Sequence, residues 1–365
     1  MVSPKTPVIC VLIILVAGQS CSYHRTPATR EISIVEQIYI PAAGCDEGEP
    51  ISNFELPLKN AARPACVSRG KPSLLPAGHA APNEGISLEV GTVIVMGVSR
   101  EQVILAADSR SGVLQLQEGR VSFLRTEDQR CKLVELGSTL LFAAAGATKT
   151  NQALPANVYY DSQELAREAV RNYVFDPAWD SQNETIRAIA VKWAWDVAFR
   201  IRRGLVAGWY RPLGPTWVTG VFAGLEPNGE ISVAVAKLEY HQARPGMIVP
   251  SVSISVLVPV LPGDFTWVEA FGRDQVAEKY LTRQLVTADT KAEHERIRAE
   301  QLRSPREFSE RPVERLVELT FEKDPLRYPD GSKLVGGKID VARLSKHGRV
   351  EWLRRKRECF STTFQ

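Results

Sequence analysis

Apolar residues in the middle of the chain gather in short runs that come in pairs. Each pair is joined by only two to four polar residues, an arrangement that predicts an antiparallel hairpin. Nearly continuous apolar runs are typical of strands that are covered on both faces. The two pairs are residues 92–98 with 103–107, and residues 131–136 with 139–145.

Further along the chain, helical spacing alternates with more apolar runs. The charged segment 293–303 is interpreted as a solvated face and is given no function. The order is strands, two helices, strands, two helices, strands, which favours an α+β fold with helices packed outside two stacked antiparallel sheets. Helices are predicted at 162–173, 183–203, 273–285 and 312–321, and strands at 216–223, 231–238, 252–260, 338–344 and 349–353.

The N-terminus predicts export. Lys5 precedes the apolar run 8–17, and small residues lead to Cys21, so residues 1–21 are interpreted as a secretory signal. The run is shorter than the ~20 residues of a membrane span. Cys21 also fits a lipoprotein signal, with membrane anchoring through that cysteine. An uncleaved anchor or a buried strand are the alternatives. A periplasmic or cell-envelope location is therefore expected.

Residues 22–91 are rich in proline, glycine and alanine, with one strand-like stretch at 32–40. They predict an extended pro-region and not a packed domain. In an exported chain Cys45 and Cys66 would form a disulfide, with two free thiols as the alternative. Cys131, farther along, is expected to be a thiol in the core.

Composition excludes several functions. The 365 residues are 44% hydrophobic and 24% charged, as in ordinary globular proteins. Forty-five Lys and Arg against 42 Asp and Glu give no support for nucleic-acid binding. The histidines and cysteines are too scattered for a metal site. Residues 146–150 lack the glycines of a phosphate loop, so no cofactor is predicted.

The predicted hairpins bring chemical groups together at strand ends. If the first turn centres at residues 100–101, opposed residue numbers sum to about 201, and Thr92 lies beside Asp108. In the second hairpin, Lys132 lies near the open end and Gly146 ends the adjoining strand. A hydroxyl, a carboxylate, a lysine and a backbone N–H are the parts of an acyl-transfer site.

The residues around these four positions resemble a proteasome β subunit and, more widely, the N-terminal-nucleophile (Ntn) hydrolases, which include the HslV-type peptidase. The resemblance extends from residue 92 to about 150 and continues more weakly to Val335-Gly336-Gly337. It implies a four-layer αββα sandwich over residues 92–354 and leaves a basic C-terminal tail at 355–365. The matching stretches are Gly91-Thr92-Val93, Val103-Ile104-Leu105-Ala106-Ala107-Asp108-Ser109-Arg110, Cys131-Lys132-Leu133 and Ala143-Ala144-Ala145-Gly146.

The resemblance implies a threonine-type peptidase that acts on peptides or proteins as a homo-oligomer. Thr92 would be the nucleophile, freed by autocleavage of the Gly91–Thr92 bond, and its α-amine, with a pKa of about 8, would carry the proton. Lys132, held by Asp108, would favour the deprotonated hydroxyl, and the N–H at Gly146 would stabilise the oxyanion. Three of these residues have a structural alternative. Thr92 could be an ordinary strand residue, Asp108 could cap a turn, and Lys132 could be an exposed strand lysine.

Four further residues would line the pocket for the residue before the cut. Arg130 would favour Glu or Asp there, although it could instead pair only with an acid of its own such as Glu127 or Asp128. The four are Ser111, Arg130, Ala144 and Thr148.

Two departures from the family pattern leave other functions open. Residues 270–273 read Ala-Phe-Gly-Arg where the family has Ser-Gly-Ser. Ser332 and Val335 occupy the places of an Asp and a Ser before the final Gly-Gly, with Asp330 only nearby. The alternatives are a non-catalytic member used for assembly or ligand binding, and an amidase that acts on small amides.

Overall fold

The computed structural model describes residues 86–117, 120–150, 154–173, 185–207, 209–210, 216–241, 251–257, 266–282, 288, 291–301 and 308–362. The chain divides into two compact units, Met1–Arg30 and Glu31–Gln365, and every described residue belongs to the second. The predicted signal, the strand-like stretch 32–40 and the Cys45–Cys66 disulfide lie outside the described residues.

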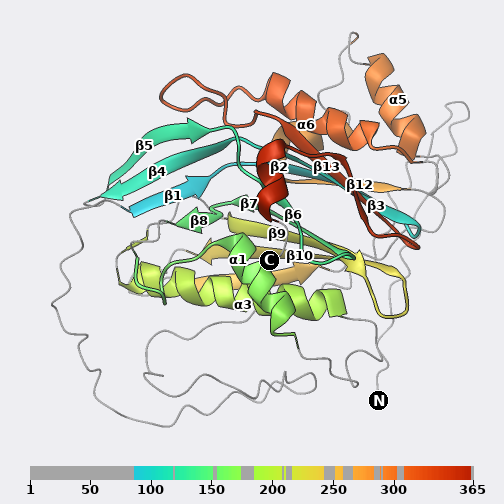
Figure 1. Cartoon of the computed structure of the whole chain (residues 1–365). Helices are drawn as coiled ribbons and strands as arrows, with labels where there is room; N and C mark the ends of the chain where they lie inside the picture. Colours follow the sequence, from blue (N-terminus) through green and yellow to red (C-terminus); the bar gives the residue numbers. More distant parts are fainter. Residues whose placement is uncertain are drawn as a thin grey trace, which may run out of the picture. The chain divides into compact units, whose positions relative to one another are not determined.

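The described residues form an α+β fold, as predicted, but with three antiparallel sheets where two were expected (Figure 1). The four-stranded sheet has the order β5 (Arg120–Glu127), β4 (Ser111–Gln117), β1 (Ile86–Val90) and β8 (Lys149–Thr150). The sheet here called the β2 sheet has the order β12 (Trp267–Gly272), β2 (Val93–Val98), β3 (Gln102–Asp108), β13 (Ile339–Ser345) and β14 (Val350–Arg354). The β7 sheet has the order β11 (Ser251–Leu257), β10 (Ile231–His241), β9 (Thr216–Leu225), β7 (Leu140–Gly146) and β6 (Leu133–Glu135).

Five α-helices are present among the described residues, and none of them is both long and apolar enough to cross a membrane. Asp161 caps the first helix, accepting hydrogen bonds from the N–H groups of Gln163 and Glu164. The helices are α1 (Ser162–Arg171), α3 (Thr185–Val206), α4 (Gln275–Leu281), α5 (Lys291–Gln301) and α6 (Arg311–Lys323), followed near the end by the 3-10 helix η1 (Arg357–Thr362).

The first predicted hairpin has the expected register. Ile94 pairs with Ala107, so opposed residue numbers sum to 201. The Ser99 hydroxyl accepts hydrogen bonds from the N–H groups of Glu101 and Gln102, which closes the turn. The C-terminal end of β3 is therefore fixed beside the N-terminal end of β2, where the candidate nucleophile lies.

Five strands are absent from the sequence-based prediction: β1, β4, β5, β8 and β12. The most consequential is β1, because residues up to 90 were expected to form an unpacked extended segment. It pairs with β4 on one side and β8 on the other, and Leu88 at its centre is buried. The last five residues before Gly91 are thus part of the folded domain.

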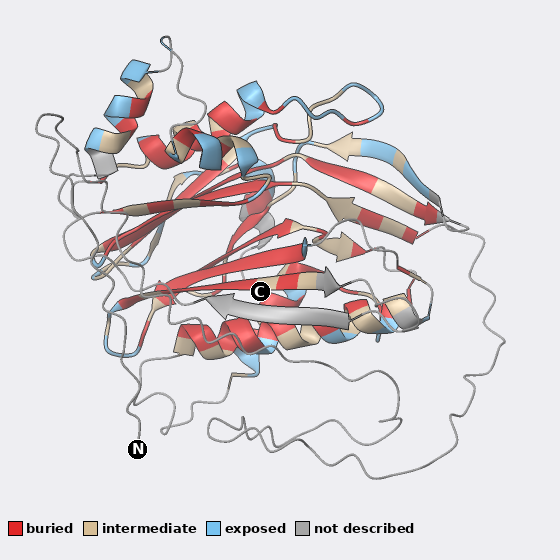
Figure 2. Cartoon of the chain, turned by 180° about the vertical axis from the view of Figure 1, so that it is seen from behind, coloured by how far each residue is buried: buried red, intermediate tan, exposed pale blue. Residues whose placement is uncertain are grey.

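Buried side chains form three clusters. Figure 2 shows the buried residues in red along the strands and on the helices. One cluster joins the β7 sheet to α1 and α3, with the rings of Phe142, Trp193 and Phe222 in contact. A second draws on both five-stranded sheets, and a third joins the β2 sheet to α4, α5 and α6. Each five-stranded sheet is therefore apolar on both faces, as its continuous apolar runs predicted.

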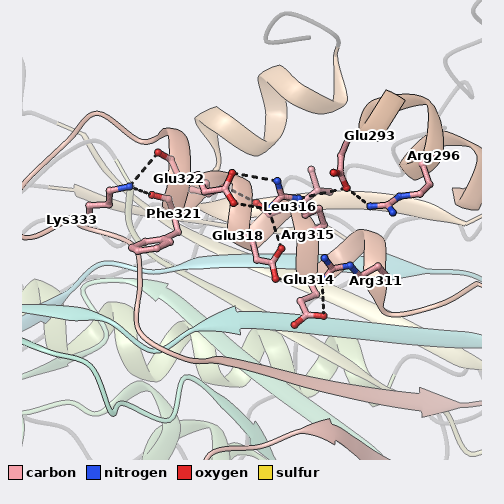
Figure 3. Close-up of polar contacts among 11 residues, drawn as sticks. Glu293, Arg296, Arg311, Glu314, Arg315, Leu316, Glu318, Phe321, Glu322 and Lys333 are labelled. Carbon is pink, nitrogen blue, oxygen red and sulfur yellow. Dashed lines mark hydrogen bonds and ion pairs between the residues drawn. The ribbon is translucent and has the colours of Figure 1, made fainter. Parts of the chain in front are cut away.

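Ion pairs connect the outer surfaces of α5 and α6 (Figure 3). Arg315 lies 3.0 Å from Glu318, 2.7 Å from Glu322 and 3.5 Å from Glu293 of α5. Its hydrogen bond to Glu322 is the main cause that raises the pKa of the guanidinium above its ordinary value. Such exposed pairs contribute at most about 1 kcal/mol each, so they orient α5 on α6 more than they stabilise the fold.

Candidate active site

Thr92 lies immediately before β2 and has an unusual backbone. Its φ is 123°, a conformation that costs a non-glycine residue on the order of 1–3 kcal/mol. The side chain is buried, and its hydroxyl has no hydrogen-bond partner among the described residues. Its carbonyl accepts a hydrogen bond of 2.9 Å from the N–H of Arg273. The threonine is therefore strained and carries an unused polar group, both of which are common at functional sites.

Asp108, at the end of β3, is the centre of the site. One carboxylate oxygen accepts the N–H of Val93 at 3.0 Å, and the other accepts the N–H groups of Arg110 at 3.3 Å and Gly336 at 3.0 Å. The side chain is 1% exposed. These bonds fix the carboxylate beside the residue that follows Thr92, as the hairpin register predicted.

Lys132 meets Asp108 from the other hairpin. Its ammonium nitrogen lies 3.4 Å from Asp108 Oδ1 and also donates to the carbonyl of Arg110. Burial lowers the pKa of Lys132 to about 8, and the negative charge of Asp108 opposes part of that effect. A lysine in this setting exchanges a proton near neutral pH, which an exposed strand lysine does not.

Gly272 lies between Thr92 and Ala145, the residue before Gly146. A Cβ added at Gly272 would lie 2.4 Å from the carbonyl oxygen of Thr92 and 2.6 Å from Cβ of Ala145. The ends of β2, β7 and β12 therefore meet there. Gly146 itself has a φ of 96°, and a Cβ on it would lie 2.5 Å from the carbonyl oxygen of Trp217, so the chain requires glycine at this point.

The four predicted pocket residues have different surroundings. Ser111 is buried with a hydroxyl that lacks a hydrogen-bond partner in the described part of the chain. Ala144 packs in the cluster under α1 and α3. Thr148 joins β1 to α1 through its backbone, donating to the carbonyl of Glu89 and accepting from the N–H of Ser162.

Arg130 pairs with acids of its own chain. Its guanidinium Nε lies 2.6 Å from Glu127 Oε2, as the alternative interpretation of this residue expected. Its Nη2 donates to Glu89, a residue of β1. The second acid was not foreseen, because β1 was not predicted to be a strand.

Sequence reasoning missed Tyr328, which covers the residue before the predicted cut. A Cβ added at Gly91 would lie 3.0 Å from Tyr328 Oη, and Gly91 has a φ of 112°. The tyrosine is buried, and burial is the largest of the effects that raise its pKa to about 12. It stacks on Phe123 of β5. A tyrosine in a turn carries no pattern that marks it for this place.

Sequence reasoning also missed the packing of the C-terminal segment. Cys131 was expected to be a core thiol, but it forms a disulfide with Cys359, 228 residues away, with the two Cα atoms 5.6 Å apart. Lys356 is buried, lies 2.8 Å from Asp340 Oδ2 and donates to the carbonyl of Arg130. Residues 355–362 of the predicted basic tail are thus packed beside the candidate lysine.

The two departures from the family pattern are also visible. The backbone N–H of Arg273 binds the carbonyl of Thr92, at the place where the family has its Ser-Gly-Ser. Ser332 donates to Asp330 at 2.6 Å, so these side chains bind each other. Gly336 of that segment reaches the site, through its N–H on Asp108.

Among the described residues, no three His, Cys, Asp or Glu side chains gather as metal ligands would. No protein-family model matches the chain, and no curated protein sequence matches it significantly. The resemblance to the Ntn hydrolases therefore rests on the residues of this chain alone.

Proposed function

We propose that the protein is a self-processing threonine peptidase of the Ntn type. Thr92, Lys132, Asp108 and Gly146 would act as nucleophile, base, support and oxyanion donor. The observation that carries the proposal is the buried hydroxyl of Thr92, which has no partner among the described residues. The next residue, Val93, donates its N–H to Asp108 Oδ1, and that oxygen lies 3.4 Å from the Lys132 ammonium. The proposal includes export to the cell envelope, which suits the Cys131–Cys359 disulfide, and assembly as a homo-oligomer.

The arrangement of apolar clusters supports a four-layer αββα sandwich. Helices α1 and α3 share a cluster with the β7 sheet, the two five-stranded sheets share the next, and α4, α5 and α6 share the last with the β2 sheet. That sequence of contacts is what two stacked sheets between helical layers would produce. The four-stranded sheet, which contains β1, is additional to this arrangement.

Self-cleavage needs a base other than the α-amine, because in the uncut chain that nitrogen belongs to the Gly91–Thr92 peptide bond. Lys132, with a pKa of about 8, is neutral often enough to take the proton. In the first step Thr92 Oγ1 would attack the carbonyl carbon of Gly91 while its proton passes to Lys132. The tetrahedral intermediate would collapse by breaking the C–N bond, and Lys132 would return the proton to the departing nitrogen.

The product of that step is an ester between the Gly91 acyl group and the Thr92 hydroxyl. Water would hydrolyse the ester, releasing the leader as a carboxylic acid and leaving Thr92 with a free α-amine and a free hydroxyl. The same hydroxyl would then attack substrate peptides, with the α-amine carrying the proton. Strain at Thr92, a non-glycine residue with a positive φ, favours the first step because cleavage relieves it.

A non-catalytic role is the second candidate. It is favoured by Asp330 and Ser332, which bind each other and not the site. A small-amide substrate is the third candidate, and parallel assays with peptide and small-amide substrates separate it from the first.

The decisive experiment compares Thr92→Val, which keeps the β-branched shape, with Thr92→Ser, which keeps the hydroxyl. Intact mass and N-terminal sequencing of the full-length products give the cut site. Wild type and Thr92→Ser should begin at residue 92, whereas Thr92→Val should keep its leader. A Thr92→Val protein that also begins at residue 92 would mean that another protease cuts the chain. An uncut wild type would favour the non-catalytic role.

A further inference from the structure

The strand β1 occupies a special position relative to the proposed cut. It ends at Val90, one residue before Gly91, and therefore belongs to the acyl side of the scissile bond. It is bound as a strand between β4 and β8, with Leu88 paired with Leu114 on one side and with Thr150 on the other. A substrate peptide must present its carbonyl carbon to the Thr92 hydroxyl as Gly91 does. The residues before its scissile bond must therefore lie where β1 lies, between β4 and β8.

Backbone pairing is independent of sequence, so the side chains of β1 decide what this place recognises. Glu89 is the third residue before the cut, and only 14% of its side chain is exposed. It binds Arg130 and lies opposite Lys149 in the β1–β8 register. Burial is the main cause that raises the pKa of Glu89, and the positive charge of Arg130 opposes that rise.

Two cations and two other acids surround Glu89. Arg130 also binds Glu127, and Lys149 binds Asp161 at 2.7 Å. Arg130 is the cation in direct contact with Glu89, so the pairing depends on that arginine. The N–H of Thr148 donates to the carbonyl of Glu89 and fixes its place along the strand. An acidic side chain here gains a charged partner, whereas a lysine would face two cations.

We propose that β1 is the protein's resident substrate strand, and that Arg130 selects peptides with an acidic residue three positions before the cut. This inference rests on the proposed function and moves the expected contact of Arg130 from the first to the third position. At the first position, the positive φ of Gly91 and the close Tyr328 hydroxyl favour glycine. Until it leaves, β1 also excludes other peptides from the space between β4 and β8.

The test uses fluorogenic hexapeptides that copy residues 86–91, acetyl-Ile-Ser-Leu-X-Val-Gly-aminomethylcoumarin, with Glu, Gln or Lys at X. The processed enzyme should cleave the Glu peptide about tenfold more efficiently than the Gln peptide, measured as kcat/KM. Arg130→Glu should reverse the order and favour Lys. Arg125→Glu is the matched control, because Arg125 also pairs with Glu127 but is exposed on β5. It should leave the order unchanged.

The outcomes separate this inference from the proposed function. Equal cleavage of the three peptides would overturn the role of Arg130 while leaving the peptidase intact. If neither the chain nor any peptide is cut, the proposed function fails, and the uncut Thr92→Val chain still tests the contact. When Arg130→Glu is added to the Thr92→Val chain, hydrogen exchange at the amides of residues 86–90 should be about tenfold faster than when Arg125→Glu is added. Unchanged exchange would overturn the inference by itself.

Discussion

The proposed base role of Lys132 makes self-cleavage dependent on pH in a way that the structure quantifies. Burial lowers the pKa of Lys132 from 10.5 to about 8, so the neutral, proton-accepting form becomes dominant above about pH 8. At pH 7 roughly one molecule in ten then carries a neutral Lys132, against about one in 3,000 for an unperturbed lysine. The lowered pKa therefore raises the fraction of neutral, proton-accepting Lys132 at pH 7 about 300-fold.

The lowered pKa of Lys132 leads to two expectations. In the wild-type chain, the rate of self-cleavage should rise about tenfold per pH unit up to pH 8 and then level off. Lys132→Arg keeps the positive charge but cannot release a proton, so this variant should be cleaved at least about 300-fold more slowly. If Lys132 acted only through its charge, Lys132→Arg would retain most of the rate.

The assay is the time course of conversion from full-length to processed protein, followed by intact mass after the chain is purified at pH 6 and shifted to each test pH. Lys192→Arg is the control, because Lys192 is exposed on α3 and pairs with Asp196 in its own helix. Circular dichroism shows whether Lys132→Arg is folded. A rate that is constant from pH 6 to 8, or wild-type cleavage by folded Lys132→Arg, would refute the reasoning.

Two more predictions concern the site's surroundings. Lys356→Met leaves Asp340 as a buried carboxylate without its partner and should cost about 3–5 kcal/mol of unfolding free energy, seen as a large drop in Tm. Adding Asp340→Asn should recover most of that loss, and a double variant as unstable as the single one would contradict the assignment. Gly91→Ala should slow self-cleavage at least about tenfold, because the new methyl meets Tyr328 and the backbone has a positive φ. Gly229→Ala, at a positive φ with open space around it, should leave the cleavage rate unchanged.

The β2–β3 hairpin could be predicted because it depends on local signals. The meeting of Asp108 with Lys132, which lie in different hairpins, was expected only from the resemblance to the Ntn hydrolases. Short polar links, continuous apolar runs and register arithmetic are all contained within a few residues. The strand β1 could not be found this way. It follows a proline-rich segment, and its partners β4 and β8 begin 25 and 63 residues after its own first residue, Ile86.

The C-terminal contacts were missed for a related reason. A run of basic residues around Lys356 reads as a solvated tail, since nothing near it in the sequence supplies an acid for burial. The acid is Asp340 of β13, placed by pairing with Ala107 of β3. Likewise, six scattered cysteines do not reveal which pairs will form, and Cys131 meets Cys359 only after the whole domain has folded.

The late position of these contacts bears on the order of events during synthesis. Chains emerge from the ribosome N-terminus first, so Thr92 and Lys132 are made long before Gly336, which supplies an N–H to Asp108. Lys356 and Cys359, which hold the segment around Lys132, come later still. If the chain cleaves itself as proposed, a chain that stops short of Gly336 is expected to keep its leader. The last thirty residues would then act as a completion signal for maturation.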